Sequence, residues 1–90
     1  MKSTKALRIL CSSKMPECRL NLHPNEGADI GLMTTQHSAR TPEGVTLELH
    51  LLNECPTESV EISSRLWERL GRPDRVVLGY ADGLIKIDPA

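Results

Sequence analysis

Four arginines in the last third of the chain have the type and spacing to contact phosphate groups. Arg65, Arg69 and Arg72 follow at intervals of four and three residues, and Arg75 comes three residues later. On a helix this spacing places guanidinium groups in one row, which could hold the phosphates of duplex DNA. The alternative is local ion pairing. Three acids each lie within a turn of an arginine, namely Glu61, Glu68 and Asp74.

Two further basic residues, Lys5 and Arg8, belong to a positively charged N-terminal segment. Residues 1–20 hold five basic side chains against one acidic, whereas residues 21–59 hold one against six, and the formal net charge of the whole chain is −1. We predict that Lys5 and Arg8 join the four arginines as DNA-contacting residues. The other interpretation is a solvated tail beside an acidic surface, because the chain is not basic overall.

Side chains that could bind a metal or act as nucleophiles are present, but their spacing fits no known site. The histidines and the three cysteines lack the paired spacing of structural zinc sites, and no phosphate-binding glycine loop occurs. We therefore predict no metal, no cofactor and no enzymatic activity. Cys11 and Cys18 are expected to be buried structural thiols. Unpaired cysteines favour a reducing, cytoplasmic location, and no apolar segment is long enough to span a bilayer.

The elements that would position the arginines are clearest between Val60 and Ile87. Alternation at Val60 and Ile62 predicts a strand, Ser63-Ser64 offers a helix N-cap, and Gly71 suits the left-handed position after a short helix. Asp82-Gly83 predicts a type I′ turn joining two strands. In that hairpin Tyr80 would face Ile85, and Leu78 would face Ile87.

This order of elements resembles the core of the AbrB/SpoVT swapped-hairpin family, whose cradle-loop barrels include transcription regulators and antitoxins. The resemblance rests on Ile62, Leu66, Leu70-Gly71 and the Asp82-Gly83 hairpin closing on Ile-Lys-Ile-Asp-Pro. It covers the last third of the chain, and Ser63 stands where the family usually has proline. The resemblance implies a homodimer that binds DNA. Double-psi barrels have a similar local pattern of elements but different functions.

The rest of the chain predicts further strands. Residues 7–11, 18–22 and 45–52 alternate apolar and polar side chains, whereas 23–27 and 36–44 are polar and are expected to be turns and loops. An internal repeat is also visible, since Leu20, Leu22, Ile30 and Gly31 match Val60, Ile62, Leu70 and Gly71 forty residues later. Residues 36–40 are too polar to mirror the strand that begins at Arg75.

We therefore predict a single domain over residues 1–90, with residues 1–5 as a disordered basic tail. Its fold would be mainly β with one short helix, as a small cradle-loop or double-psi-like barrel built from two related halves. For function we predict a cytoplasmic DNA-binding transcription regulator or antitoxin, acting as a homodimer and not bound to membranes. The alternative is a non-enzymatic β-barrel module for protein–protein interaction, which binds a protein partner and no nucleic acid.

Overall fold

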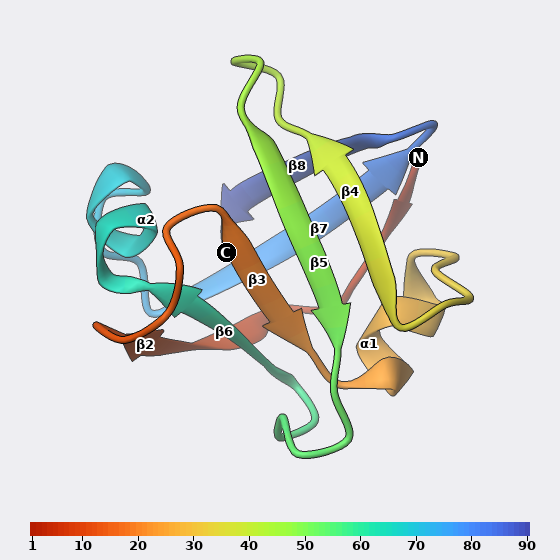
Figure 1. The fold of residues 1–90 in the computed structure, drawn as a ribbon, viewed down its shortest axis with the longest axis horizontal. Helices are drawn as coiled ribbons and strands as arrows, with labels where there is room; N and C mark the ends of the chain where they lie inside the picture. The colour runs from red at the N-terminus through yellow and green to blue at the C-terminus, as the bar shows by residue number, and fades with distance from the viewer.

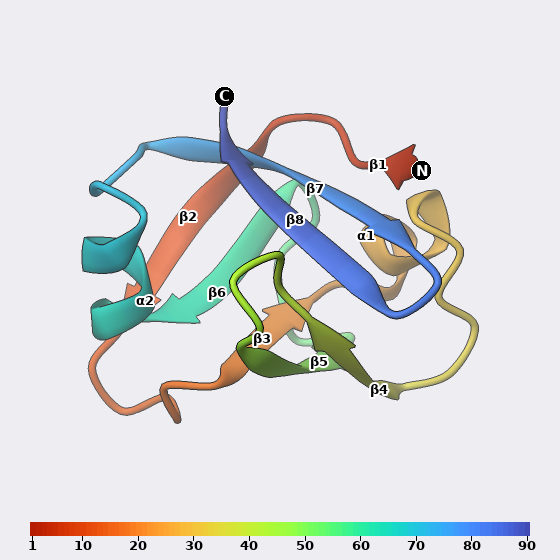
Figure 2. The ribbon, with the colours of Figure 1, turned by 90° about the horizontal axis from the view of Figure 1, so that it is seen from above.

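The computed structural model describes residues 1–90 as a β-barrel with a short helix at each of two opposite sides (Figures 1 and 2). The strands are β1 (Lys2–Ser3), β2 (Leu7–Ser12), β3 (Arg19–Leu22), β4 (Gln36–Arg40), β5 (Thr46–Leu51), β6 (Ser59–Ser63), β7 (Arg75–Ala81) and β8 (Leu84–Pro89). The helices are α1 (Pro24–Asp29) and α2 (Ser64–Arg69). Neither helix is long or apolar enough to cross a membrane.

Seven strands close the barrel in the order β7-β2-β6-β3-β5-β4-β8, and β8 returns to β7. Strands β2 and β6 are parallel, as are β3 and β5, while β3 and β6 between them are antiparallel. The predicted small, mainly β barrel is confirmed. Closure removes most exposed strand edges, which a small sheet would otherwise have to protect.

The chain repeats one unit of strand, strand, helix and strand. The first copy is β2, β3, α1 and β4, and the second is β5, β6, α2 and β7. His23 and Ser63 cap the two helices at equivalent positions, and Gly31 and Gly71 follow them with φ of 82° and 85°. Each parallel pair joins a strand of one half to a strand of the other. The two halves are therefore joined by crossed parallel pairing within one chain.

Aliphatic side chains fill the interior of the barrel, as the scarcity of aromatic residues requires. Strands β3 and β5 contribute alternate leucines, and β6, β7 and β8 contribute the residues that face them. The members with 0% exposure are Leu7, Leu20, Leu22, Leu49, Val60, Val76, Leu78 and Ile85. Alternation therefore identified the inward faces of these strands, because residues two apart point to the same side.

The second half matches the prediction from sequence closely. The Ser63 hydroxyl accepts a hydrogen bond from the Leu66 amide at 3.1 Å and so caps α2. Strands β7 and β8 pair in the predicted register, with Tyr80 opposite Ile85 and Leu78 opposite Ile87. Asp82 and Gly83 have φ of 49° and 81°, as a type I′ turn requires.

Helix α1 was not predicted, since residues 23–27 were expected to form a turn, and the fold has two short helices instead of one. Pro24 occupies the first turn, where its missing N–H costs nothing, and the His23 ring accepts a hydrogen bond from the Asn25 amide at 3.0 Å. Gly27 lies inside this helix, and a larger residue would crowd β5, because a Cβ at this position would lie 2.7 Å from the side chain of Leu51. The glycine that was taken as a turn residue thus permits close packing of the helix against β5.

Strand β4 also differs from the prediction, which made residues 36–40 a polar loop. Its five residues pair antiparallel with β5, from Gln36 opposite His50 to Arg40 opposite Thr46. Only Ala39 is buried, so the strand carries almost no hydrophobic alternation. Backbone pairing with a strong neighbouring strand determines its structure, and β4 occupies the place in the first half that β7 holds in the second.

The N-terminal residues, expected to form a disordered tail, lie against β7. Lys2 and Ser3 form β1 opposite Tyr80 and Gly79, and Thr4 exchanges hydrogen bonds with the backbone of Leu78 at 2.8 and 3.1 Å. The register with β7 then shifts by one residue before Leu7 pairs with Val76. This shift is a β-bulge, and β1 and β2 act as one interrupted strand.

Replacing Asp82 with proline tests the terminal hairpin. Proline fixes φ near −65° and cannot adopt the positive φ of Asp82, so the turn must rearrange at a cost of at least about 1 kcal/mol. We expect Asp82→Pro to lower the melting temperature by about 4 °C or more, measured by circular dichroism. Asp82→Asn is the control, because asparagine tolerates positive φ and should melt like the native protein. Equal melting of the two variants would contradict the turn.

Candidate interaction groove

The two arginines of α2 and Arg72, which follows the helix, form ion pairs with acids of the same chain. Arg65 and Arg69 lie 3.5 and 3.4 Å from the carboxylate of Glu17, and Arg72 lies 3.3 Å from Glu68. The Arg72 guanidinium also stands over the Trp67 ring, 5.7 Å from its centre. Glu17 comes from the loop between β2 and β3, so spacing along the sequence could not identify it as the partner. The predicted row of cations is largely neutralised within the molecule.

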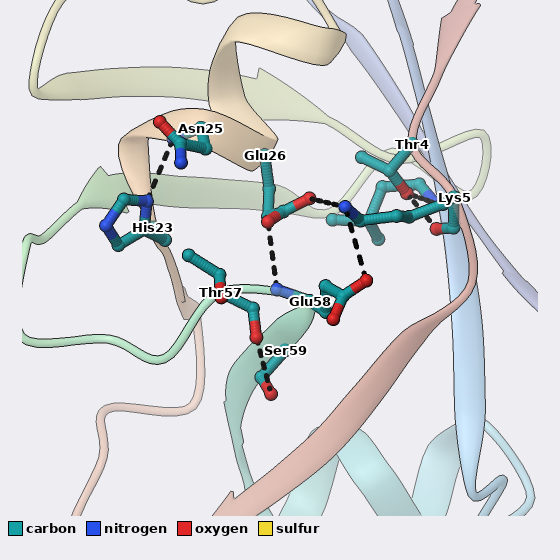
Figure 3. Close-up of polar contacts among 9 residues, drawn as sticks. Thr4, Lys5, His23, Asn25, Glu26, Thr57, Glu58 and Ser59 are labelled. Carbon is teal, nitrogen blue, oxygen red and sulfur yellow. Dashed lines mark hydrogen bonds and ion pairs between the residues drawn. The ribbon is translucent and has the colours of Figure 1, made fainter.

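Lys5 is held by two glutamates, one of them buried (Figure 3). Its ammonium group lies 3.5 Å from Glu58 and 3.8 Å from Glu26, whose side chain is only 1% exposed. The other oxygen of Glu26 accepts a hydrogen bond from the Glu58 amide at 2.9 Å. Glu58 has a φ of 60°, and its hydrogen bond to the carboxylate of Glu26 in α1 stabilises this conformation of the loop that leads into β6. Glu26 is a structural acid, and Lys5 is one of its partners.

Arg8 and Arg75 are the two predicted DNA-contacting residues that form no ion pair. They lie directly opposite each other on the antiparallel strands β2 and β7. Like charges in that position repel, and nothing of opposite charge lies within ion-pair distance of either. They border a depression of about 420 Å³ beside Trp67, Pro73 and Asp74. An anion between the two guanidinium groups would relieve the repulsion.

An apolar depression lies elsewhere, lined by residues of α2 and the turn after it, of β8, and of the β4–β5 hairpin, and Figure 2 shows where these elements lie. We call it the β8 groove, and its volume is about 370 Å³. Its apolar lining is Pro42, Val45, Leu47, Leu66, Leu70, Ile85 and Ile87. Val45 is 36% exposed there, and Leu66, Leu70 and Ile87 are half-buried. Arg69, Lys86, Glu43 and Asp88 add charges of both signs around the opening.

One wall of the β8 groove is an incompletely paired strand. Strand β8 pairs with β7 along all six of its residues, but with β4 only at Leu84, opposite Arg40. At this closure the Arg40 amide donates a hydrogen bond to the Gly83 carbonyl at 2.8 Å. Beyond Ile85, the edge of β8 that faces the groove has no paired strand. The groove therefore combines apolar side chains with free main-chain hydrogen-bonding groups.

The sequence did not predict this groove. Leu66, Leu70 and Ile87 were recognised as apolar positions, and residues 41–44 were recognised as a turn. Their meeting depends on how β8 crosses the end of β4, and these segments lie far apart in the chain. An exposed Val45 beside a turn was the one local signal, because apolar residues there were expected to point inward.

Cysteine and histidine side chains form no cluster of three or more that could hold a metal ion. All three thiols are free. Cys11 and Cys18 are exposed rather than buried as predicted, because they lie where β2 ends and β3 begins, beyond the core. Cys55 is buried, and desolvation, followed by the nearby charge of Glu61, raises the pKa of its thiol above the ordinary value.

No protein-family model matches this chain, and a search of curated proteins found no match either. The groove and the basic residues therefore have to be interpreted from their own chemistry.

Thiol labelling tests this arrangement of cysteines. In native protein at neutral pH, we expect a maleimide to modify Cys11 and Cys18 quickly and Cys55 slowly, because Cys55 is buried and its raised pKa suppresses the reactive thiolate. Mass spectrometry should show two fast additions, and a third after denaturation. Cys55→Ala should abolish only the third. Rapid triple labelling of folded protein would contradict the buried position of Cys55.

Proposed function

We propose that this protein is a non-enzymatic interaction module that binds an extended segment of a protein partner in the β8 groove. The observation that carries the proposal is the free edge of β8 beside an apolar lining. An added strand would gain main-chain hydrogen bonds from this edge, and its alternate side chains would enter the groove. Neither feature alone specifies an extended chain, but together they match what such a segment presents.

The charge arrangement supports this choice over DNA binding. Four of the six predicted DNA-contacting residues, Lys5, Arg65, Arg69 and Arg72, already form ion pairs within the chain. A duplex would have to displace acids from them, and the net charge of −1 supplies no general attraction for a polyanion. The three free thiols support a reducing compartment such as the cytoplasm as the place of action.

A DNA-binding regulator or antitoxin is the second candidate, and one observation favours it. The facing pair Arg8 and Arg75 has no acid partner, and a phosphate could bridge the two groups. The resemblance of residues 60–87 to swapped-hairpin regulators points the same way. Arg8 and Arg75 do not line the β8 groove, so separate sets of variants can test the two candidates.

Selection of short random peptides on immobilised protein tests the groove. We expect enriched peptides to carry apolar residues at alternate positions, because only every second side chain of an added strand faces the groove. Val45→Asp should weaken these peptides by about tenfold or more, since it places a charge against their apolar side chains. Met33→Asp is the matched control, because Met33 is 87% exposed and lies outside the groove. Failure to enrich any peptide, or equal affinity for both variants, would refute the proposed site.

A salt titration with mixed duplex DNA separates the two candidates. The proposed function predicts no binding even at low salt. Binding that falls steeply as salt rises would instead support the regulator, because each phosphate contact releases counterions. In that case Arg8→Ala with Arg75→Ala should reduce both the affinity and the salt slope. Arg65→Ala with Arg69→Ala should change them little, because Glu17 already engages both side chains.

A further inference from the structure

The free edge of β8 presents main-chain groups at one defined residue. In the two-residue turn, the flanking pair Ala81 and Leu84 is hydrogen-bonded, so Leu84, Lys86 and Asp88 direct their backbone groups toward β7. The residues between them point the other way. The Gly83 carbonyl confirms this alternation, because it accepts a hydrogen bond from Arg40 of β4. The N–H and C=O of Ile87 therefore face the groove.

The side chains around Ile87 are self-complementary. Lys86 and Asp88 flank it, both are exposed, and neither forms an ion pair within the chain. If two copies of β8 met antiparallel with their Ile87 residues opposite each other, Lys86 would face the partner's Asp88, and Asp88 would face the partner's Lys86. Opposite charges in directly opposed positions stabilise antiparallel strands. Any shift of register by two residues would lose this match.

We propose that the segment received by the β8 groove is β8 of a second copy of this chain, paired antiparallel about Ile87. This inference rests on the proposed function, because it names the occupant of the same groove. The two Ile87 residues exchange a pair of main-chain hydrogen bonds, and one lysine and one aspartate from each chain form two ion pairs across the contact. Apolar contact with Val45, Leu66 and Leu70 adds to the association.

The same geometry limits the assembly to two copies. The other edge of β8 is occupied by β7, so each chain offers one free edge at this position. Pro89 has no N–H, and it ends the edge beyond Asp88. A contact in which the same patch meets itself closes on a twofold axis and leaves no edge for a third chain.

Charge reversal tests this pairing, measured by analytical ultracentrifugation over a range of concentrations. The native chain should dimerise. Lys86→Asp makes both facing pairs acidic, and Asp88→Lys makes both basic, so each variant alone should dissociate at least about tenfold more readily, which corresponds to 1.4 kcal/mol. Mixing the two variants should restore a dimer that contains one of each. The double variant, Lys86→Asp with Asp88→Lys, should also recover native dimerisation.

Lys14→Asp is the control, because Lys14 is exposed in the loop before β3 and forms no ion pair. It changes the net charge equally and should leave the dimer intact, and circular dichroism should show that every variant is folded. If the native chain dimerises and neither charge reversal changes the dissociation constant of the dimer, the inference is overturned. A monomer at all concentrations that still binds selected peptides would also overturn it while leaving the proposed function standing. If the native chain neither binds selected peptides nor dimerises, both proposals are refuted.

Discussion

The antiparallel contact between β3 and β6 is the centre on which the barrel depends. Leu20 lies opposite Ile62 and Leu22 opposite Val60, and these residues are matched by the forty-residue repeat. Between them, the Asn21 amide donates a hydrogen bond of 2.7 Å to the Glu61 carboxylate. Each strand then takes a parallel neighbour from the other half, β2 on one side and β5 on the other. A pseudo-twofold axis through this contact therefore places four strands at once, and neither half can complete a core without the other.

The two halves depart from symmetry where the interaction chemistry lies. At equivalent positions in the helices, α1 carries Glu26 and α2 carries Leu66. The buried Glu26 secures a loop through the Glu58 amide, whereas the half-buried Leu66 packs against the core and lines the groove. The larger difference is β8, which follows only the second half. It completes the ring by pairing with β4 at one residue, Leu84, and then diverges from β4. The groove is thus a consequence of adding a seventh strand to a symmetric unit.

What the sequence could predict depended on whether local chemistry or distant pairing decided the structure. Strand β6, helix α2 and the Asp82-Gly83 hairpin were predictable, because caps, left-handed glycine positions and alternation act over a few residues. Helix α1 was missed because Pro24 and Gly27 on either side of Asn25 favour a turn, and histidine is not one of the usual N-cap residues. Strand β4 was missed because only Ala39 is buried. The acid partner Glu17, the facing pair Arg8 and Arg75, and the groove depend on tertiary proximity, which no spacing rule could give.

A free strand edge normally carries protection against unwanted pairing, and β8 has two such features, Lys86 and Pro89. A lysine on a strand edge disfavours pairing with most other strands, because its charge would lie unpaired beside the apolar side chains of the added strand. Here Asp88 stands on the same exposed face, two residues away, so the protection is selective. A random strand meets an unpaired lysine, whereas an antiparallel strand with an acid at the matching position meets a partner. The half-buried Ile87 between them would then stabilise the contact by burying more of its apolar side chain. The charges of Lys86 and Asp88 therefore disfavour pairing with unrelated strands, and the same charges would specify the partner strand.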